Sequence, residues 1–90
     1  MKFKGTFIKA LEVETFEGKD FKKQKIVLMD PSDNQPTKIV FELHKDRIAL
    51  AEGLVEGMMV EADFNIVGRE HNGNYYNTLK IWSLKKVILT

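Results

Sequence analysis

The order of hydrophobic patterns along the chain most constrains its fold, because strand-like segments follow one another almost without interruption. Apolar and polar residues alternate, with some irregularities, over residues 2–15, 21–30, 37–43, 56–70 and 75–87. Between them lie turn-forming residues 16–20, the loop 31–36 framed by two prolines, and the pair Asn72-Gly73. An Asn-Gly pair between such runs is typical of a tight hairpin. The pattern predicts five strands.

A short helix is predicted between the third and fourth strands, over residues 47–52. Asp46 can cap its first turn, and Gly53 suits its end. A helix this short needs a sheet to pack against. The residues expected on its packing face are Ile48, Ala51, Leu54 and Val55.

Five strands in 90 residues, with a helix after the third, predict an all-β fold. We expect a single OB-fold domain over residues 1–90, a five-stranded Greek-key barrel with one short helix between strands 3 and 4. An SH3-like barrel is the alternative, although it usually has no helix at that position. The chain has no cysteine, so packing alone must hold this small core.

Alternation within the strands predicts which side chains face the barrel interior. In the fourth strand, Val60, Ala62, Phe64 and Ile66 share the inward face. In the last strand, Leu79 and Ile81 are expected inside. The residues of the opposite parity are then expected outside, namely Tyr76, Thr78, Lys80, Trp82 and Leu84. Gly5, inside the first strand, indicates a bulge or a sharp bend.

Several function classes find no support in the sequence. Cysteine is absent, and the two histidines occur outside any spaced metal-ligand motif. No phosphate loop, nucleophile elbow or dinucleotide fingerprint is present, so we expect a protein that is not an enzyme and needs no cofactor or metal. The sequence also lacks a long apolar segment, which favours a cytoplasmic protein without membrane contact.

Two stretches carry a family resemblance. "EGMMVEADFNIVGRE" followed by "NGNYYNTLKIWSLKK" resembles the fourth and fifth strands of small single-stranded-DNA-binding OB domains. The chain is most similar to short bacterial and phage proteins of this type, which carry a Lys-Lys-Gln motif in strand two, here Lys22 to Gln24. The resemblance implies binding to single-stranded DNA. The chain stops at "KKVILT" without a long acidic tail, which fits a phage-type or accessory protein.

Basic and aromatic residues interleave where such a strand of nucleic acid would lie. Formal net charge is only +1, so a binding surface requires the charges to be segregated. Single strands are bound by cations that track the backbone and by rings on which bases stack. The predicted nucleic-acid-binding residues are Phe21, Lys22, Lys23, Lys25, Lys38, Arg69, Tyr75, Tyr76, Lys80 and Trp82.

Each of these features also has a simpler explanation. Lysines protect sheet edges from aggregation, and Trp82 can pack beneath a loop. An OB-type protein-interaction module is therefore the alternative function, and RNA is a second possible polymer for the same surface. The apolar end, residues 87–90, predicts an edge strand that pairs in a homodimer or a larger homo-oligomer.

Overall fold

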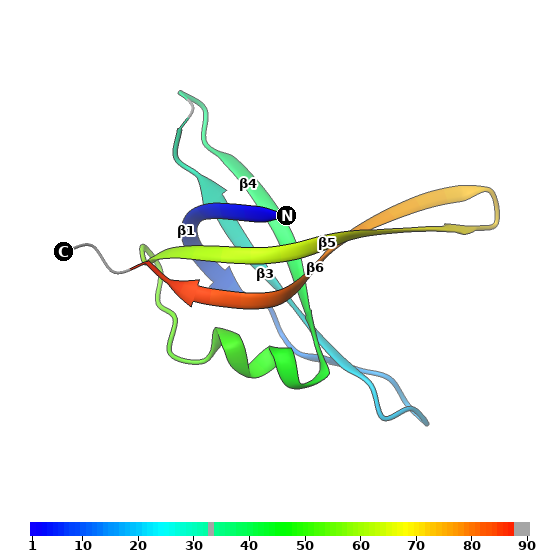
Figure 1. The fold of residues 1–90 in the computed structure, drawn as a ribbon. Helices are drawn as coiled ribbons and strands as arrows, with labels where there is room; N and C mark the ends of the chain where they lie inside the picture. Colours follow the sequence, from blue (N-terminus) through cyan, green and yellow to red (C-terminus); the bar gives the residue numbers. More distant parts are fainter. Residues whose placement is uncertain (33, 88–90) are drawn as a thin grey trace.

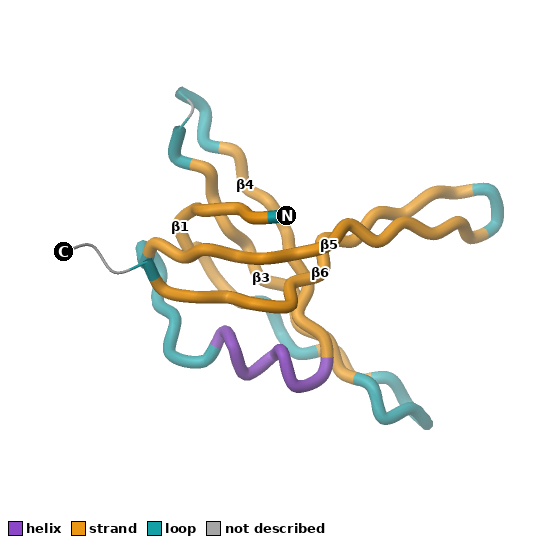
Figure 2. The backbone as a smooth tube through the Cα atoms, viewed as in Figure 1, coloured by secondary structure: helices purple, strands orange, loops and turns teal. Residues whose placement is uncertain are grey.

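The computed structural model describes residues 1–32 and 34–87, and their strands form a closed barrel (Figures 1 and 2). A two-residue strand, β2 (Glu14–Thr15), adds to one end of β3 (Lys22–Asp30). In chain order the elements are β1 (Lys2–Ala10), β2 (Glu14–Thr15), β3 (Lys22–Asp30), β4 (Thr37–His44), the 3₁₀ helix η1 (Lys45–Ala51), β5 (Met59–His71) and β6 (Asn74–Lys86).

The barrel closes because β1 has two partners. Its first half pairs antiparallel with β5, and its second half pairs antiparallel with β3. The remaining order runs β5-β6-β4-β3, with β4 and β6 parallel at the pair Glu42–Lys80. Together with η1 between β4 and β5, this is the OB-fold, so the predicted fold is confirmed and the SH3-like alternative is not.

The core lies inside the barrel and contains side chains from each of the long strands. Alternation places them inward, as the sequence predicts. Phe41 is fully buried, and Phe3 and Phe64 pack against it with ring centroids 5.5 and 5.1 Å away. The buried apolar residues are Phe7, Ile26, Leu28, Phe41, Leu43, Val60, Ala62, Ile81 and Leu84.

A bulge at Trp82 changes the predicted alternation in β6. The register runs from Asp63–Ser83 directly to Phe64–Ile81, so Trp82 is left without a partner on β5. The bulge explains why Leu84, expected on the outer face with Trp82, is buried three residues after Ile81. Trp82 itself faces outward, as predicted.

The helix η1 begins earlier than predicted and is a 3₁₀ helix. It starts at Lys45, directly after β4, so Asp46 lies in its first turn and does not cap it. Ile48, Ala51 and Leu54 pack against the core as expected, whereas Val55 is exposed because the chain has already turned at Gly53. In the part of the chain described, no helix is long and apolar enough to cross a lipid bilayer.

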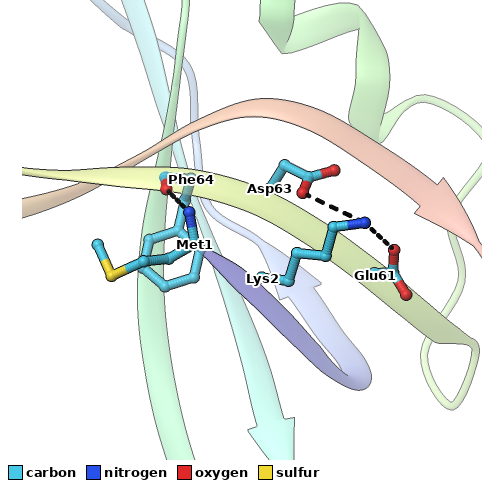
Figure 3. Close-up of polar contacts among 5 residues, drawn as sticks. All are labelled: Met1, Lys2, Glu61, Asp63 and Phe64. Atoms are coloured by element: carbon cyan, nitrogen blue, oxygen red, sulfur yellow. Dashed lines mark hydrogen bonds and ion pairs between the residues drawn. The ribbon is translucent and has the colours of Figure 1, made fainter.

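Gly5 marks the place where β1 passes from β5 to β3. The predicted irregularity lies further on, between Phe7 and Lys9, and Gly5 instead allows a close backbone approach. A Cβ atom at Gly5 would lie 2.5 Å from the carbonyl oxygen of Met29. Before this point β1 lies along β5, where the Lys2 ammonium is 3.5 Å from Glu61 and 3.9 Å from the largely buried Asp63 (Figure 3).

The β5–β6 hairpin extends away from the barrel, and we call its residues 65–80 the arm (Figures 1 and 2). The base of the arm is still in the barrel wall, because Lys80 pairs with Glu42 of β4. Asn72 and Gly73 both adopt positive φ angles, 53° and 81°, as a tight two-residue hairpin turn requires. The predicted turn is confirmed. Ile66, predicted in the core, is instead 54% exposed, because it lies on the arm outside the barrel.

Candidate nucleic-acid interface

Two adjoining hollows lie on the outer face of the barrel, and together we call them the groove. They share Phe21, His44 and Lys80, so they form one continuous surface. The outer hollow, about 490 Å³, is lined by Phe16, Lys19, Phe21, Lys23, Glu42, His44, Val67, Arg69, Thr78 and Lys80. The inner hollow, about 470 Å³, is lined by Phe21, His44, Lys45, Asp46, Arg47, Asn65, Lys80, Ile81 and Trp82.

The β3–β4 ladder supplies the floor of the groove. Lys23 pairs with His44 and Lys25 pairs with Glu42, so these four side chains share the outer face. Their alternate neighbours, among them Ile26 and Leu43, fill the core. In an OB-fold this is the face, together with the loops after the first strand and in the last hairpin, that binds oligonucleotides and oligosaccharides.

Aromatic side chains line the outer hollow. The rings of Phe16 and Phe21 lie 5.4 Å apart, and Phe21 meets the imidazole of His44 edge-on at 5.2 Å. The Lys23 ammonium lies 5.7 Å from the centre of the Phe16 ring. Rings beside cations are the combination that binds single-stranded nucleic acid.

A carboxylate lies among these groups. Glu42 Oε1 is 2.9 Å from His44 Nε2 and 3.9 Å from Lys23 Nζ. All three side chains are mostly buried, at 14%, 20% and 17% exposure respectively. Their mutual contacts therefore restrict the directions in which Lys23 and His44 point.

The arm has two different faces. Cross-strand partners lie on the same face, so the pairs Asn65–Lys80, Val67–Thr78 and Arg69–Tyr76 share the side that continues the groove. On the other side lie Ile66–Leu79 and Glu70–Tyr75. There the Tyr75 side chain hydrogen-bonds the Glu70 carboxylate, which raises the pKa of the Tyr75 phenol.

Trp82 forms part of the wall of the inner hollow. The residue is 50% exposed, so its indole is accessible from solvent. Asn65 and Lys80, which pair across the arm, lie in the same hollow. The bulge therefore places an aromatic ring beside an amide and an ammonium group.

Charge is segregated into the groove. Among the described residues, the two hollows contain six cations and two carboxylates, a formal net charge of +4. The whole chain carries +1, so the rest of the molecule is net negative. A polyanion would therefore be drawn to this face.

The fold brings half of the predicted binding residues into the groove, namely Phe21, Lys23, Arg69, Lys80 and Trp82. Tyr76 lies next to it with Arg69, and Lys22 lines a smaller neighbouring hollow with Lys45 and Asp46. Lys25 is beside Glu42 on the same strand ladder. Lys38 is at the far end of β4, and Tyr75 is on the opposite face of the arm.

Other groove residues were not predicted from the sequence. They depend on the register of β3 against β4 and on the path of η1, which no single motif encodes. Alternation is the signal that could have placed Glu42 and His44 on one face, had the third strand been extended from residue 43 to 44, but it carries no information on their contact with Lys23. The groove residues outside the predicted set are Phe16, Lys19, Glu42, His44, Lys45, Asp46, Arg47, Asn65, Val67, Thr78 and Ile81.

Residues 2–85 match a family described as a domain of unknown function, DUF3127. The chain belongs to this family. No curated protein matches it.

Solved structures of single-stranded-DNA-binding proteins have the same fold. The SSB domain of a Synechococcus sp. protein superposes with a TM-score of 0.70 at 10% identity, covering 94% of this chain and 91% of that one. For the mitochondrial single-stranded DNA-binding protein Rim1 of S. cerevisiae the TM-score is 0.65 at 17% identity, over 97% and 92%.

A dimeric protein is also similar. The N-terminal domain of PriB from Thermoanaerobacter tencongensis, solved as a dimer, has a TM-score of 0.69 at 15% identity and covers 99% of this chain and 96% of that one. At these identities the likeness establishes the OB-fold for the DUF3127 chain.

Proposed function

We propose that this DUF3127 protein binds single-stranded DNA through the groove, with little preference for sequence. The observation that carries the proposal is the concentration of rings and cations there, with net charge +4 on a chain of net charge +1. Structural neighbours described as single-stranded-DNA-binding proteins support it. The protein acts by binding and has no catalytic role.

The groove has groups for both parts of a nucleotide. Bases stack on the rings of Phe16, Phe21 and Trp82, and each stack contributes about 1–3 kcal/mol whatever the base. Lys23, Arg69 and Lys80 neutralise phosphates and release their counterions. Because none of these contacts reads a base edge, affinity should depend more on salt than on sequence.

The proposed setting is DNA replication or recombination in the cytoplasm, in a phage-type or accessory role. Single-stranded RNA offers the same stacking surfaces and phosphates, so it is a second ligand for the same groove. We propose a homodimer as the working form, which the dimeric PriB domain supports by analogy of fold.

Titration of tryptophan fluorescence with oligo-dT at two salt concentrations tests the proposal. Trp82 is the single tryptophan, so the signal reports on the inner hollow. We expect the fluorescence to change on binding and the affinity to fall steeply with salt. If oligo-dT has no effect at low salt, and a filter or gel assay also detects no complex, the proposed function is wrong.

A protein-interaction module is the second candidate, because the arm exposes apolar side chains on both faces. Ile66 and Tyr75 lie on the side away from the groove, where no nucleic acid is proposed. Absence of binding to oligo-dT and oligo-U, combined with a stable protein complex formed through the arm, would favour this alternative.

A further inference from the structure

A mostly buried carboxylate lies on the floor of a groove proposed to bind phosphate. On the basis of that proposed function, we infer that Glu42 is a positioning residue that holds Lys23 and His44. We further propose that binding of a polynucleotide phosphate to Lys23 is coupled to protonation of His44.

The hydrogen bond between Glu42 and His44 determines where the imidazole carries its proton. An ionised carboxylate only accepts hydrogen bonds, so at 2.9 Å from Glu42 Oε1 the His44 Nε2 atom must be the donor. Nδ1 is then the position that gains or loses a proton. An imidazole gains this second proton in the range of pH 5 to 8.

Lys23 is the cation that a phosphate would compete for. Its ammonium is 3.9 Å from Glu42 Oε1 and faces the Phe16 ring. When the ammonium turns toward a phosphate, Glu42 loses that partner while its side chain stays only 14% exposed. Protonated His44, already hydrogen-bonded to the carboxylate, replaces the lost positive charge.

The other charged groups around Glu42 and His44 also favour protonation of His44 when a phosphate binds. Nearly all are cations, which a bound phosphate partly neutralises, so its arrival favours one more positive charge in the groove. From β3 these are Lys23 and Lys25, from the loop before it Lys19, from β5 Arg69, from β6 Lys80, and from η1 Lys45, Asp46 and Arg47.

The test measures affinity for oligo-dT against salt at pH 6 and pH 8, since thymine does not titrate in this range. One additional cation at pH 6 should steepen the slope of log K against log salt by about 0.7. Binding at low salt should be roughly threefold tighter at pH 6, as expected for one added charge near a phosphate in a solvent-accessible groove. Titration calorimetry in buffers of different ionisation enthalpy should show proton uptake on binding.

Substitution of each histidine shows which side chain takes up the proton on binding. His44→Gln should bind oligo-dT with the same slope at both pH values. His71→Gln is the matched control, because His71 is the other histidine in the chain and lies at the tip of the arm. This control should keep the wild-type pH dependence.

Glu42→Gln tests the positioning role. A neutral amide no longer favours the imidazolium, so the increase in slope should disappear between pH 8 and pH 6, while Glu42→Asp should retain it. Thermal melts establish that each variant is folded, and the calorimetric proton uptake of the wild type tests the coupling without any substitution.

Different results contradict the proton coupling, the positioning role of Glu42 and the proposed function. Wild-type protein that binds oligo-dT with equal slopes at both pH values and takes up no proton overturns the coupling but leaves the proposed function intact. An unchanged pH dependence in Glu42→Gln overturns the positioning role. Protein that binds no oligo-dT at either pH overturns the proposed function itself.

Discussion

Lys23 shows how the position of a single residue determines its role. It is one of three lysines at the start of β3, yet only its side chain reaches both the Phe16 ring and the Glu42 carboxylate. Lys38 lies on the same outer face of the β3–β4 ladder, but at the opposite end of β4 from His44. Similar residues on one sheet face therefore have different surroundings.

We expect Lys23→Glu to weaken binding to oligo-dT more than tenfold, because it replaces a groove cation with a charge that repels phosphate. Lys38→Glu makes the same change in net charge outside the two hollows, so its effect should be markedly smaller. Fluorescence anisotropy of labelled oligo-dT measures both. Equal losses would mean that only the overall charge matters.

Trp82→Ala should also weaken binding, by one stacking interaction of about 1–3 kcal/mol, roughly five- to a hundredfold. Trp82 is half exposed, and as the bulge residue of β6 it has no partner on β5. The domain should therefore remain folded. Anisotropy gives the affinity and circular dichroism the fold. A folded variant with wild-type affinity would exclude Trp82 from the binding surface.

Gly5 provides a test of stability at the residue scale. A methyl group there would lie 2.5 Å from the backbone oxygen of Met29 and 2.5 Å from the Phe3 ring, so Gly5→Ala should cost about 1–3 kcal/mol of unfolding free energy. Gly68→Ala is the control, since its nearest contact would be 3.4 Å away. Urea denaturation compares them. Equal midpoints would show that β1 can shift without strain.

At the scale of elements, the arm separates two kinds of surface. Its turn depends on Asn72 and Gly73, and its register determines which side each aromatic ring faces. Tyr76 pairs with Arg69 on the groove side, whereas Tyr75 pairs with Glu70 on the other. Two adjacent tyrosines therefore belong to opposite surfaces.

We expect Tyr76→Ser to weaken oligo-dT binding severalfold and Tyr75→Ser to leave it nearly unchanged. The physical reason is that neighbouring residues on a strand point to opposite faces. Binding isotherms at one salt concentration suffice for the comparison. A larger effect of Tyr75 would place the DNA on the other side of the arm.

At the scale of the whole molecule, two surfaces are candidates for the interface of the proposed homodimer: the predicted edge strand and the far face of the arm. The predicted edge strand was residues 87–90, of which residues 88–90 lie outside the described part of the chain. The Val87 amide donates to the Met59 carbonyl oxygen at 2.9 Å within the same chain. This amide is therefore not available to pair with a strand of another chain. On the far face of the arm, Ile66 and Tyr75 are 54% and 77% exposed, so this face is a second candidate for pairing between two copies.

One chain has a mass of 10.4 kDa, and light scattering should give twice this mass if the protein is a homodimer. Ile66→Lys places a charge on the apolar face of the arm and should lower the mass to that of a monomer. Val67→Lys, on the groove side, is the control for the loss of one exposed aliphatic residue. A wild-type monomer at micromolar concentration would contradict the dimer.

The sequence alone determined the strands, the Asn-Gly turn, the OB-fold and the outward direction of Trp82. These features depend on local alternation and turn chemistry, which neighbouring residues encode. It did not predict the bulge at Trp82, the exposure of Ile66 or the contacts of Glu42 with Lys23 and His44. The tertiary structure decided these, because they depend on which strands pair, in what register, and where the barrel ends.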